Sequence, residues 1–164
     1  MSYQFNADEI FEMAERIEKN GCKFYRMAAE KADNQKNKEL LLKLAKMEEE
    51  HEKVFSSLRK ELSLSDRDPT VFDPDDQLGL YLQSMADGNV FDMGTDPAAF
   101  FTGQESMADI LNKAIGMEKN SIIFYLGMKE IVSELKGKDK IDQLIKEEMS
   151  HIGFLSTEMA SLSS

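Results

Sequence analysis

The sequence carries one helical pattern twice, one hundred residues apart. Residues 17–25 read Ile-Glu-Lys-Asn-Gly-Cys-Lys-Phe-Tyr, and residues 117–125 read Met-Glu-Lys-Asn-Ser-Ile-Ile-Phe-Tyr. The same offset places Glu48 and His51 on Glu148 and His151. Because so many unlike residue types agree at one offset, chance is a poor explanation. We therefore expect one structural unit, a pair of helices, to occur twice within the fold.

Apolar residues recur at helical spacing in four long segments, at about 8–31, 35–62, 107–135 and 139–162. Two N-cap signals support the starts, since Asn6 and Ser106 each precede an acidic residue by three positions. Short turns at 33–34 and 137–138 predict that the helices form two antiparallel hairpins.

The segment between the two hairpins holds all three prolines of the chain. It is long enough to cross the length of a bundle, and residues 75–86 within it have the pattern of a short helix. The prediction is an all-α four-helix bundle with one long crossover between the second and third helices. It forms a single domain over 1–164, with hairpins at about 6–62 and 106–162 and the crossover at about 63–105.

Charge and composition exclude several classes of protein. The formal net charge is −11, which repels nucleic-acid phosphates and anionic membrane surfaces, so we expect neither partner. No apolar run reaches the roughly 18 residues of a membrane span. The first residues show no signal-peptide pattern, which favours the cytoplasm. The single cysteine allows neither an internal disulfide nor a cysteine-rich metal site.

The two histidines of the chain each follow a glutamate by three positions, as Glu48…His51 and Glu148…His151. Residues three apart on a helix share a face, so a carboxylate and an imidazole can bind one metal ion together. Both pairs lie on the apolar stripe of their helices. Glu18 and Glu118 lie on the corresponding stripes of the other two helices. Neighbouring glutamates, among them Glu49, Glu50, Glu52 and Glu147, are expected to point toward solvent.

Four carboxylates and two imidazoles are thus expected to point into the bundle. Buried carboxylates without partners are unfavourable by several kcal/mol or take up protons. Two divalent cations would neutralise four carboxylates. The alternatives are an acidic cleft filled with solvent and a pair of core histidines bonded to glutamates.

The chain resembles the rubrerythrin branch of the ferritin-like di-iron carboxylate proteins over all four helices. The resemblance implies that Glu48 and Glu148 bridge two iron ions, that Glu18 and Glu118 are terminal ligands, and that His51 and His151 each hold one ion. Manganese or zinc would also suit oxygen and imidazole ligands. The resemblance also implies that Tyr25 and Tyr125 donate hydrogen bonds near the site in a supporting catalytic role. The alternative is that they are ordinary core tyrosines.

Two features depart from that family. Ser121 stands where rubrerythrins carry a further metal-binding glutamate, and the chain has no paired Cys-x-x-Cys motifs of a rubredoxin-like domain. We therefore expect a separate electron donor.

The predicted function is a non-haem di-iron oxidoreductase that reduces peroxide or dioxygen, as in defence against oxidative stress. The alternatives are a ferroxidase that handles iron and a metal-binding helical protein without turnover. The helix expected at about 107–135 is apolar around more of its circumference than the other helices, so a second side of it must be covered. Together with the resemblance, this predicts a homodimer.

Overall fold

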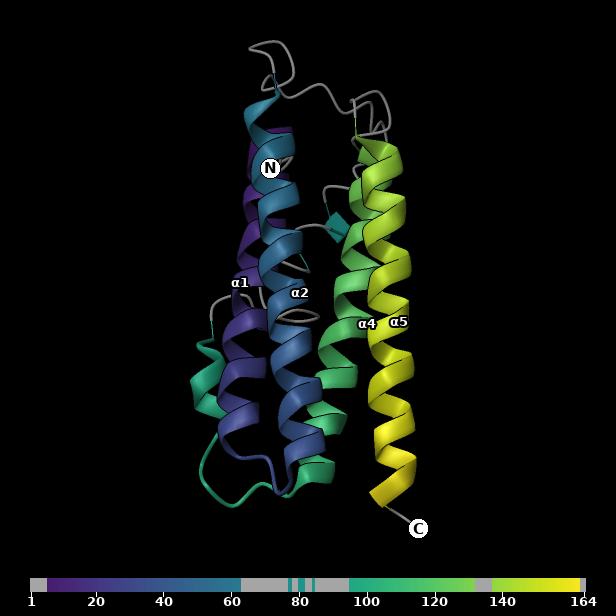
Figure 1. Cartoon of the computed structure of the whole chain (residues 1–164). Helices are drawn as coiled ribbons and strands as arrows, with labels where there is room; N and C mark the ends of the chain where they lie inside the picture. The colour runs from purple at the N-terminus through teal and green to yellow at the C-terminus, as the bar shows by residue number, and fades with distance from the viewer. Residues whose placement is uncertain are drawn as a thin grey trace.

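The computed structural model describes residues 6–62, 77, 80, 81, 84, 95–131 and 137–162. Within these residues the long helices are α1 (Ala7–Glu30), α2 (Gln35–Lys60), α4 (Met107–Ile131) and α5 (Lys138–Leu162). A short 3-10 helix, η2 (Pro97–Phe100), precedes α4 and packs against α1. Figure 1 shows α1 beside α2 and α4 beside α5. The predicted all-α four-helix bundle is confirmed.

The described helix ends lie within two residues of the predicted ones, apart from the end of the third helix. Residues 132–135, which were predicted to extend that helix, lie outside the described residues. At the start of α1, the Asn6 side chain accepts from the Glu9 amide at 2.9 Å, and the Glu9 carboxylate accepts from the Asn6 amide at 3.0 Å. Ser106 and Asp109 repeat this exchange at the start of α4. These reciprocal bonds satisfy amide groups that have no partner within the helix.

The apolar core has two halves, and their composition gives the directions of the helices. One half contains Phe55 of α2 and Phe124 of α4, so the later parts of both helices lie in the same half. The other half contains Leu41 of α2 and Leu111 of α4, so the earlier parts of both helices lie together there. Helices α2 and α4 therefore run in the same direction (Figure 1).

Most of the predicted crossover lies outside the described residues, so its path stays a prediction. The same holds for the predicted helix at 75–86, of which residues 77, 80, 81 and 84 are described and helical. Among the described helices, none combines the length and the hydropathy that crossing a membrane requires.

Candidate metal centre

The six predicted metal ligands meet between the two halves of the core. Glu18 comes from α1 and Glu118 from α4, while α2 and α5 each contribute a glutamate and a histidine. Each of the six residues is at most 3% exposed. The helical stripes read from the sequence therefore identify a buried polar layer between the two apolar halves of the core. The six candidate ligands are Glu18, Glu48, His51, Glu118, Glu148 and His151.

These residues form two groups that share two members. One group, the His51 group, consists of Glu18, Glu48, His51 and Glu148, and the other, the His151 group, consists of Glu48, Glu118, Glu148 and His151. Within each group the candidate ligand atoms lie within 4.8 Å of one another. Because Glu48 and Glu148 belong to both groups, each could contribute a carboxylate oxygen to either group.

The two histidines direct the same nitrogen, Nδ1, toward the carboxylates. His51 Nδ1 lies 3.2 Å from Glu148 Oε1 and 3.4 Å from Glu18 Oε2. His151 Nδ1 lies 2.9 Å from Glu148 Oε2 and 3.2 Å from Glu48 Oε1. The rings are nearly parallel, with centroids 5.5 Å apart. A metal ion in either group would therefore bind its histidine through Nδ1 rather than Nε2.

Two buried tyrosines connect the two hairpins across this layer. The Tyr25 hydroxyl on α1 donates to Glu118 on α4, and the Tyr125 hydroxyl on α4 donates to Glu18 on α1. Burial, followed by the charge of the nearby carboxylates, raises the pKa of both tyrosines well above 10. The hydroxyls thus stay protonated and act as donors to the two carboxylates that each occur in one group only.

The hydrogen bonding of the cluster fits metal ions. Several buried atoms lie close together in it, yet none of them makes a well-aligned hydrogen bond within the described part of the chain: Glu18 Oε2, Glu48 Oε1, both carboxylate oxygens of Glu148 and the Nδ1 atoms of both histidines. Buried polar atoms normally have a partner. Carboxylate oxygen and imidazole nitrogen are ligands for iron, manganese and zinc, so cations would satisfy the whole set at once.

Without metal, protons take the place of the cations. Burial opposes charge on the imidazoles, but the adjacent carboxylates outweigh it and raise the pKa of His51 to about 11 and that of His151 to about 10. Burial and the neighbouring carboxylates raise the pKa of Glu148 to about 8 and that of Glu48 well above 4.5. Metal binding would therefore displace protons from the cluster.

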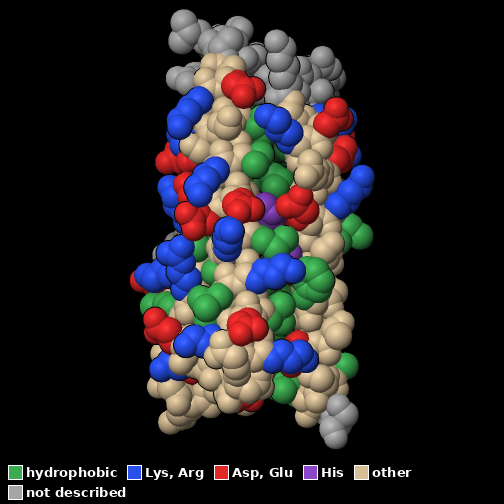
Figure 2. Space-filling view, viewed as in Figure 1, with side chains coloured by type: hydrophobic (Ala, Val, Ile, Leu, Met, Phe, Trp, Pro, Cys, Tyr) green, Lys and Arg blue, Asp and Glu red, His purple; other side chains and the backbone are tan. Residues whose placement is uncertain are grey.

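The structure corrects one sequence prediction, because Glu147 does not simply point toward solvent. Its Oε2 lies 2.9 Å from His51 Nε2, and 35% of its side chain is exposed. The stripe of α5 missed this contact because it reaches across to another helix. The repeat could have drawn attention to Glu147, because the equivalent position of the first copy is Met47 and the two copies differ there. Figure 2 shows histidine between acidic side chains in the furrow between α2 and α5.

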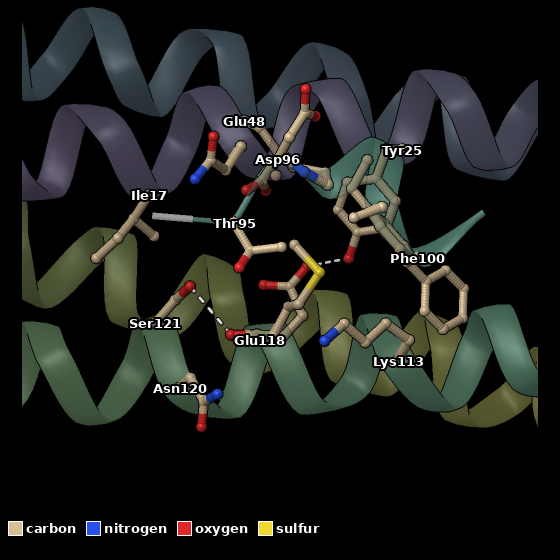
Figure 3. A pocket seen from close by; sticks show the side chains of 16 residues that line it. Ile17, Tyr25, Glu48, Thr95, Asp96, Phe100, Lys113, Glu118, Asn120 and Ser121 are labelled. Carbon is tan, nitrogen blue, oxygen red and sulfur yellow. Dashed lines mark hydrogen bonds between the residues drawn. The ribbon is translucent and has the colours of Figure 1, made fainter. Parts of the chain in front are cut away.

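A cavity of about 310 Å³ opens on the other side of the cluster, between α1 and α4 (Figure 3). Glu48 and Glu118 line it, together with Gly21 and its repeat counterpart Ser121. A Cβ atom at Gly21 would lie 2.4 Å from Glu48 Oε2, so glycine is what allows this carboxylate its position. The sequence pattern identified Gly21 and Ser121 as inward-facing but gave no sign of the cavity.

Comparison with known proteins gives one family. Residues 9–78 match the family model described as Rubrerythrin, which covers α1 and α2. Neither the comparison with curated proteins nor that with solved structures gave a match. The second hairpin lies beyond the matched residues, but it repeats the glutamate, tyrosine and Glu-x-x-His pattern of the first and completes the same buried cluster. The family match over the first hairpin and the buried carboxylate–histidine cluster together support a likeness to the rubrerythrins of the ferritin-like di-iron family.

Proposed function

We propose that this protein is a non-haem di-iron oxidoreductase that reduces peroxide or dioxygen. The observation that carries the proposal is the pair of buried ligand groups that share Glu48 and Glu148. Two ferrous ions bound there would supply two electrons to one molecule of oxidant.

The residues of the chain have distinct tasks in this proposal. Glu48 and Glu148 would hold the ions in both groups, and each histidine would provide the neutral nitrogen ligand of its group. Tyr25 and Tyr125 fix the orientation of the two terminal carboxylates by donating to them. Such partners of metal ligands commonly matter nearly as much as the ligands themselves.

The cavity provides an access route for the oxidant. Glu48 and Glu118 line it, and the small residues Gly21 and Ser121 stand beside them in its wall. A separate protein or a small reductant would return electrons to the site.

The direct test is metal analysis of protein purified without air, followed by rapid mixing with peroxide or oxygen. We expect about two ions per chain and a change of the iron absorption that is faster with peroxide or oxygen than in their absence. Bound iron that is inert to both oxidants would contradict the proposal and favour a metal-binding protein without turnover. A large multi-subunit shell in native mass measurements would instead favour iron storage.

The ligand assignment has its own prediction. His51→Ala and His151→Ala should each lower bound metal below the wild-type value of about two ions per chain, because each removes the only nitrogen ligand of its group. Glu49→Ala is the control, since that carboxylate pairs on the surface with Arg26 and Lys53. Unchanged metal content in both histidine variants, measured by mass spectrometry of the eluted metal, would refute the assignment.

A further inference from the structure

The cavity beside the candidate metal centre is larger than peroxide or dioxygen requires. Its volume of about 310 Å³ is about ten times the roughly 30 Å³ that a water molecule occupies in the liquid. This volume reaches the range of small-molecule binding sites, which begins at about 300 Å³. The cavity therefore has room for an organic molecule next to the site.

The walls of the cavity are mainly apolar. Ile17 and Phe24 of α1 face Met117 of α4, and Phe100 of η2 closes one side. The rings of Phe24 and Phe100 lie 5.7 Å apart, so they form a continuous aromatic wall. Such a surface favours the apolar body of a ligand.

One cation in the cavity lacks a counter-ion among the described residues. Figure 3 shows the Lys113 amine pointing into the cavity, and it lies 6.0 Å from the centroid of the Phe100 ring. No ion pair of Lys113 is found in the described part of the chain. Asp96, which also lines the cavity, is already neutralised by Lys23 at 2.7 Å. The lysine charge is therefore available to an anionic ligand.

We propose that this cavity binds an organic carboxylate, with its charged end on Lys113 and its apolar body between Phe24, Phe100 and Met117. The inference rests on the proposed function in one respect. Bound divalent cations would neutralise Glu48 and Glu118 at the floor of the cavity, which otherwise repel an anion.

Octanoate, 1-octanol and octylamine are suitable probes because they share one chain and differ in charge. Calorimetric titration uses the full chain loaded with zinc, which does not change its oxidation state. We expect octanoate to bind at least tenfold more tightly than 1-octanol, and octylamine to bind most weakly. Equal binding of octanoate and 1-octanol, or no binding of either, would refute the proposal. A protein that is inert to peroxide would leave this measurement unaffected.

Variants assign the binding to the cavity. Lys113→Met should weaken octanoate binding at least tenfold and leave 1-octanol unchanged, whereas Lys113→Arg should retain most of the affinity. Lys119→Met removes an exposed lysine of the same helix and is the matched control. Ala99→Phe should weaken both probes, because it adds a bulky side chain to the lining of the cavity. Octanoate binding that survives Lys113→Met at full strength would show that the metal, rather than the lysine, holds the carboxylate.

The opposite face of the cluster supports a second inference, because the two histidines have different outer neighbours. His51 Nε2 lies 2.9 Å from Glu147 Oε2, whereas the buried His151 Nε2 has no hydrogen-bond partner among the described residues. In the repeat, the counterpart of Glu147 is Met47, whose thioether is only a weak acceptor. An imidazole that donates Nε2–H to a carboxylate has a fixed ring orientation and a more basic Nδ1.

We infer that Glu147 is a positioning residue that makes the His51 group the tighter of the two metal sites. Zinc titration with a competing chelator should then give two unequal binding steps. Glu147→Ala should weaken the tighter step by about 10- to 100-fold. Glu147→Gln should restore much of this loss, since its amide oxygen still accepts from Nε2–H. Met47→Gln should strengthen the weaker step by giving His151 a partner.

Glu50→Ala is the control for the loss of one surface charge, because it removes an exposed acid of α2. The NMR signal of the His51 Nε2–H proton should shift in Glu147→Ala and persist in Glu50→Ala. Two equal binding steps in the wild type, or the same loss in Glu50→Ala as in Glu147→Ala, would refute the inference.

Discussion

Tyr25 and Tyr125 show how single residues join the two copies of the repeat. Each is on one hairpin and donates to a carboxylate of the other, at Glu118 and Glu18 respectively. The neighbouring ring pairs have almost the same geometry in both copies, with centroid distances of 5.8 Å for Phe24–Tyr25 and 5.9 Å for Phe124–Tyr125. Equivalent contacts therefore occur in both copies, as expected for two hairpins related by approximate two-fold symmetry.

Removing one hydroxyl tests this link. We expect Tyr25→Phe to lower the free energy of unfolding by about 1–3 kcal/mol, because Glu118 loses a buried donor. Tyr81→Phe is the control, since its hydroxyl donates to the carbonyl oxygen of Ile123 in a partly exposed contact. Denaturant titration measures both variants. An equal loss in Tyr25→Phe and Tyr81→Phe would contradict a special role for the buried hydroxyl.

At the residue scale, the members of the buried cluster were predictable because the repeat and the helical stripes pointed to the same residues. The repeat paired the two histidines, and the helical stripe separated Glu48 from Glu49 and Glu50. Glu147 was not predictable from its stripe, because its contact with His51 depends on how α5 and α2 approach each other. A stripe reports the face of one helix and carries no information about that distance.

At the element scale, α1 contains a glycine that lowers the stability of the helix but leaves space for a carboxylate of the cluster. Glycine inside a helix is less favourable than alanine by about 1 kcal/mol. At Gly21, however, a Cβ atom would lie 2.4 Å from Glu48 Oε2. The carboxylate is the flexible end of its side chain, so it would move aside and leave its ligand position, while the backbone need not shift.

Gly21→Ala should therefore weaken metal binding, by at least tenfold, without unfolding the metal-free protein. Gly116→Ala offers a matched control on α4, because nothing lies within 4 Å of its added Cβ. It should gain up to about 1 kcal/mol of stability and keep its metal affinity. Chelator competition and thermal unfolding, run on both variants, separate the two effects. Full metal affinity in Gly21→Ala would show that Glu48 tolerates another position.

The long helices were predictable because their caps and apolar periods are local properties of the sequence. Asn6 with Glu9 and Ser106 with Asp109 form the reciprocal bonds that the pattern predicts. The cavity was not predictable, because it arises where η2 meets α1 and α4. Its walls come from segments far apart in the sequence, and their spacing depends on tertiary packing.

At the scale of the whole molecule, α4 keeps apolar side chains on its outer surface. Ile123 is 43% exposed and Leu126 is 49% exposed, although Phe124 and Met128 are fully buried. Tyr81 covers part of this surface by packing on Gly127, where a Cβ would lie 2.4 Å from its ring. The remaining apolar area fits the predicted homodimer.

The dimer is expected to depend on this outer surface of α4. Sedimentation at micromolar concentration should show a species of twice the 18.6 kDa chain mass. The double variant Ile123→Lys and Leu126→Lys should shift it to monomer. Leu42→Lys is the control on α2, at a site with similar exposure of 45%. A clean 18.6 kDa species in the wild type would rule out the dimer.

The stability of the whole molecule should depend on pH, and bound metal should offset the loss of stability at high pH. In the metal-free protein the pKa of His51 is raised from 6.5 to about 11, that of His151 to about 10, and that of Glu148 from 4.5 to about 8. A group with a raised pKa binds more protons in the folded state than in the unfolded state. Its contribution is complete below the unfolded pKa and disappears as the pH rises through the folded pKa.

The melting temperature of metal-free protein should therefore fall between pH 6 and pH 9, a range in which the ordinary surface carboxylates are ionised throughout. Zinc should raise the melting temperature more at pH 9 than at pH 6, because fewer protons compete for the ligands and the ions bind only the folded cluster. The double variant His51→Ala and His151→Ala should show a smaller fall without metal. Calorimetric scans at the two pH values decide the matter, since a metal-free protein that melts higher at pH 9 than at pH 6 cannot contain a cluster held together by protons.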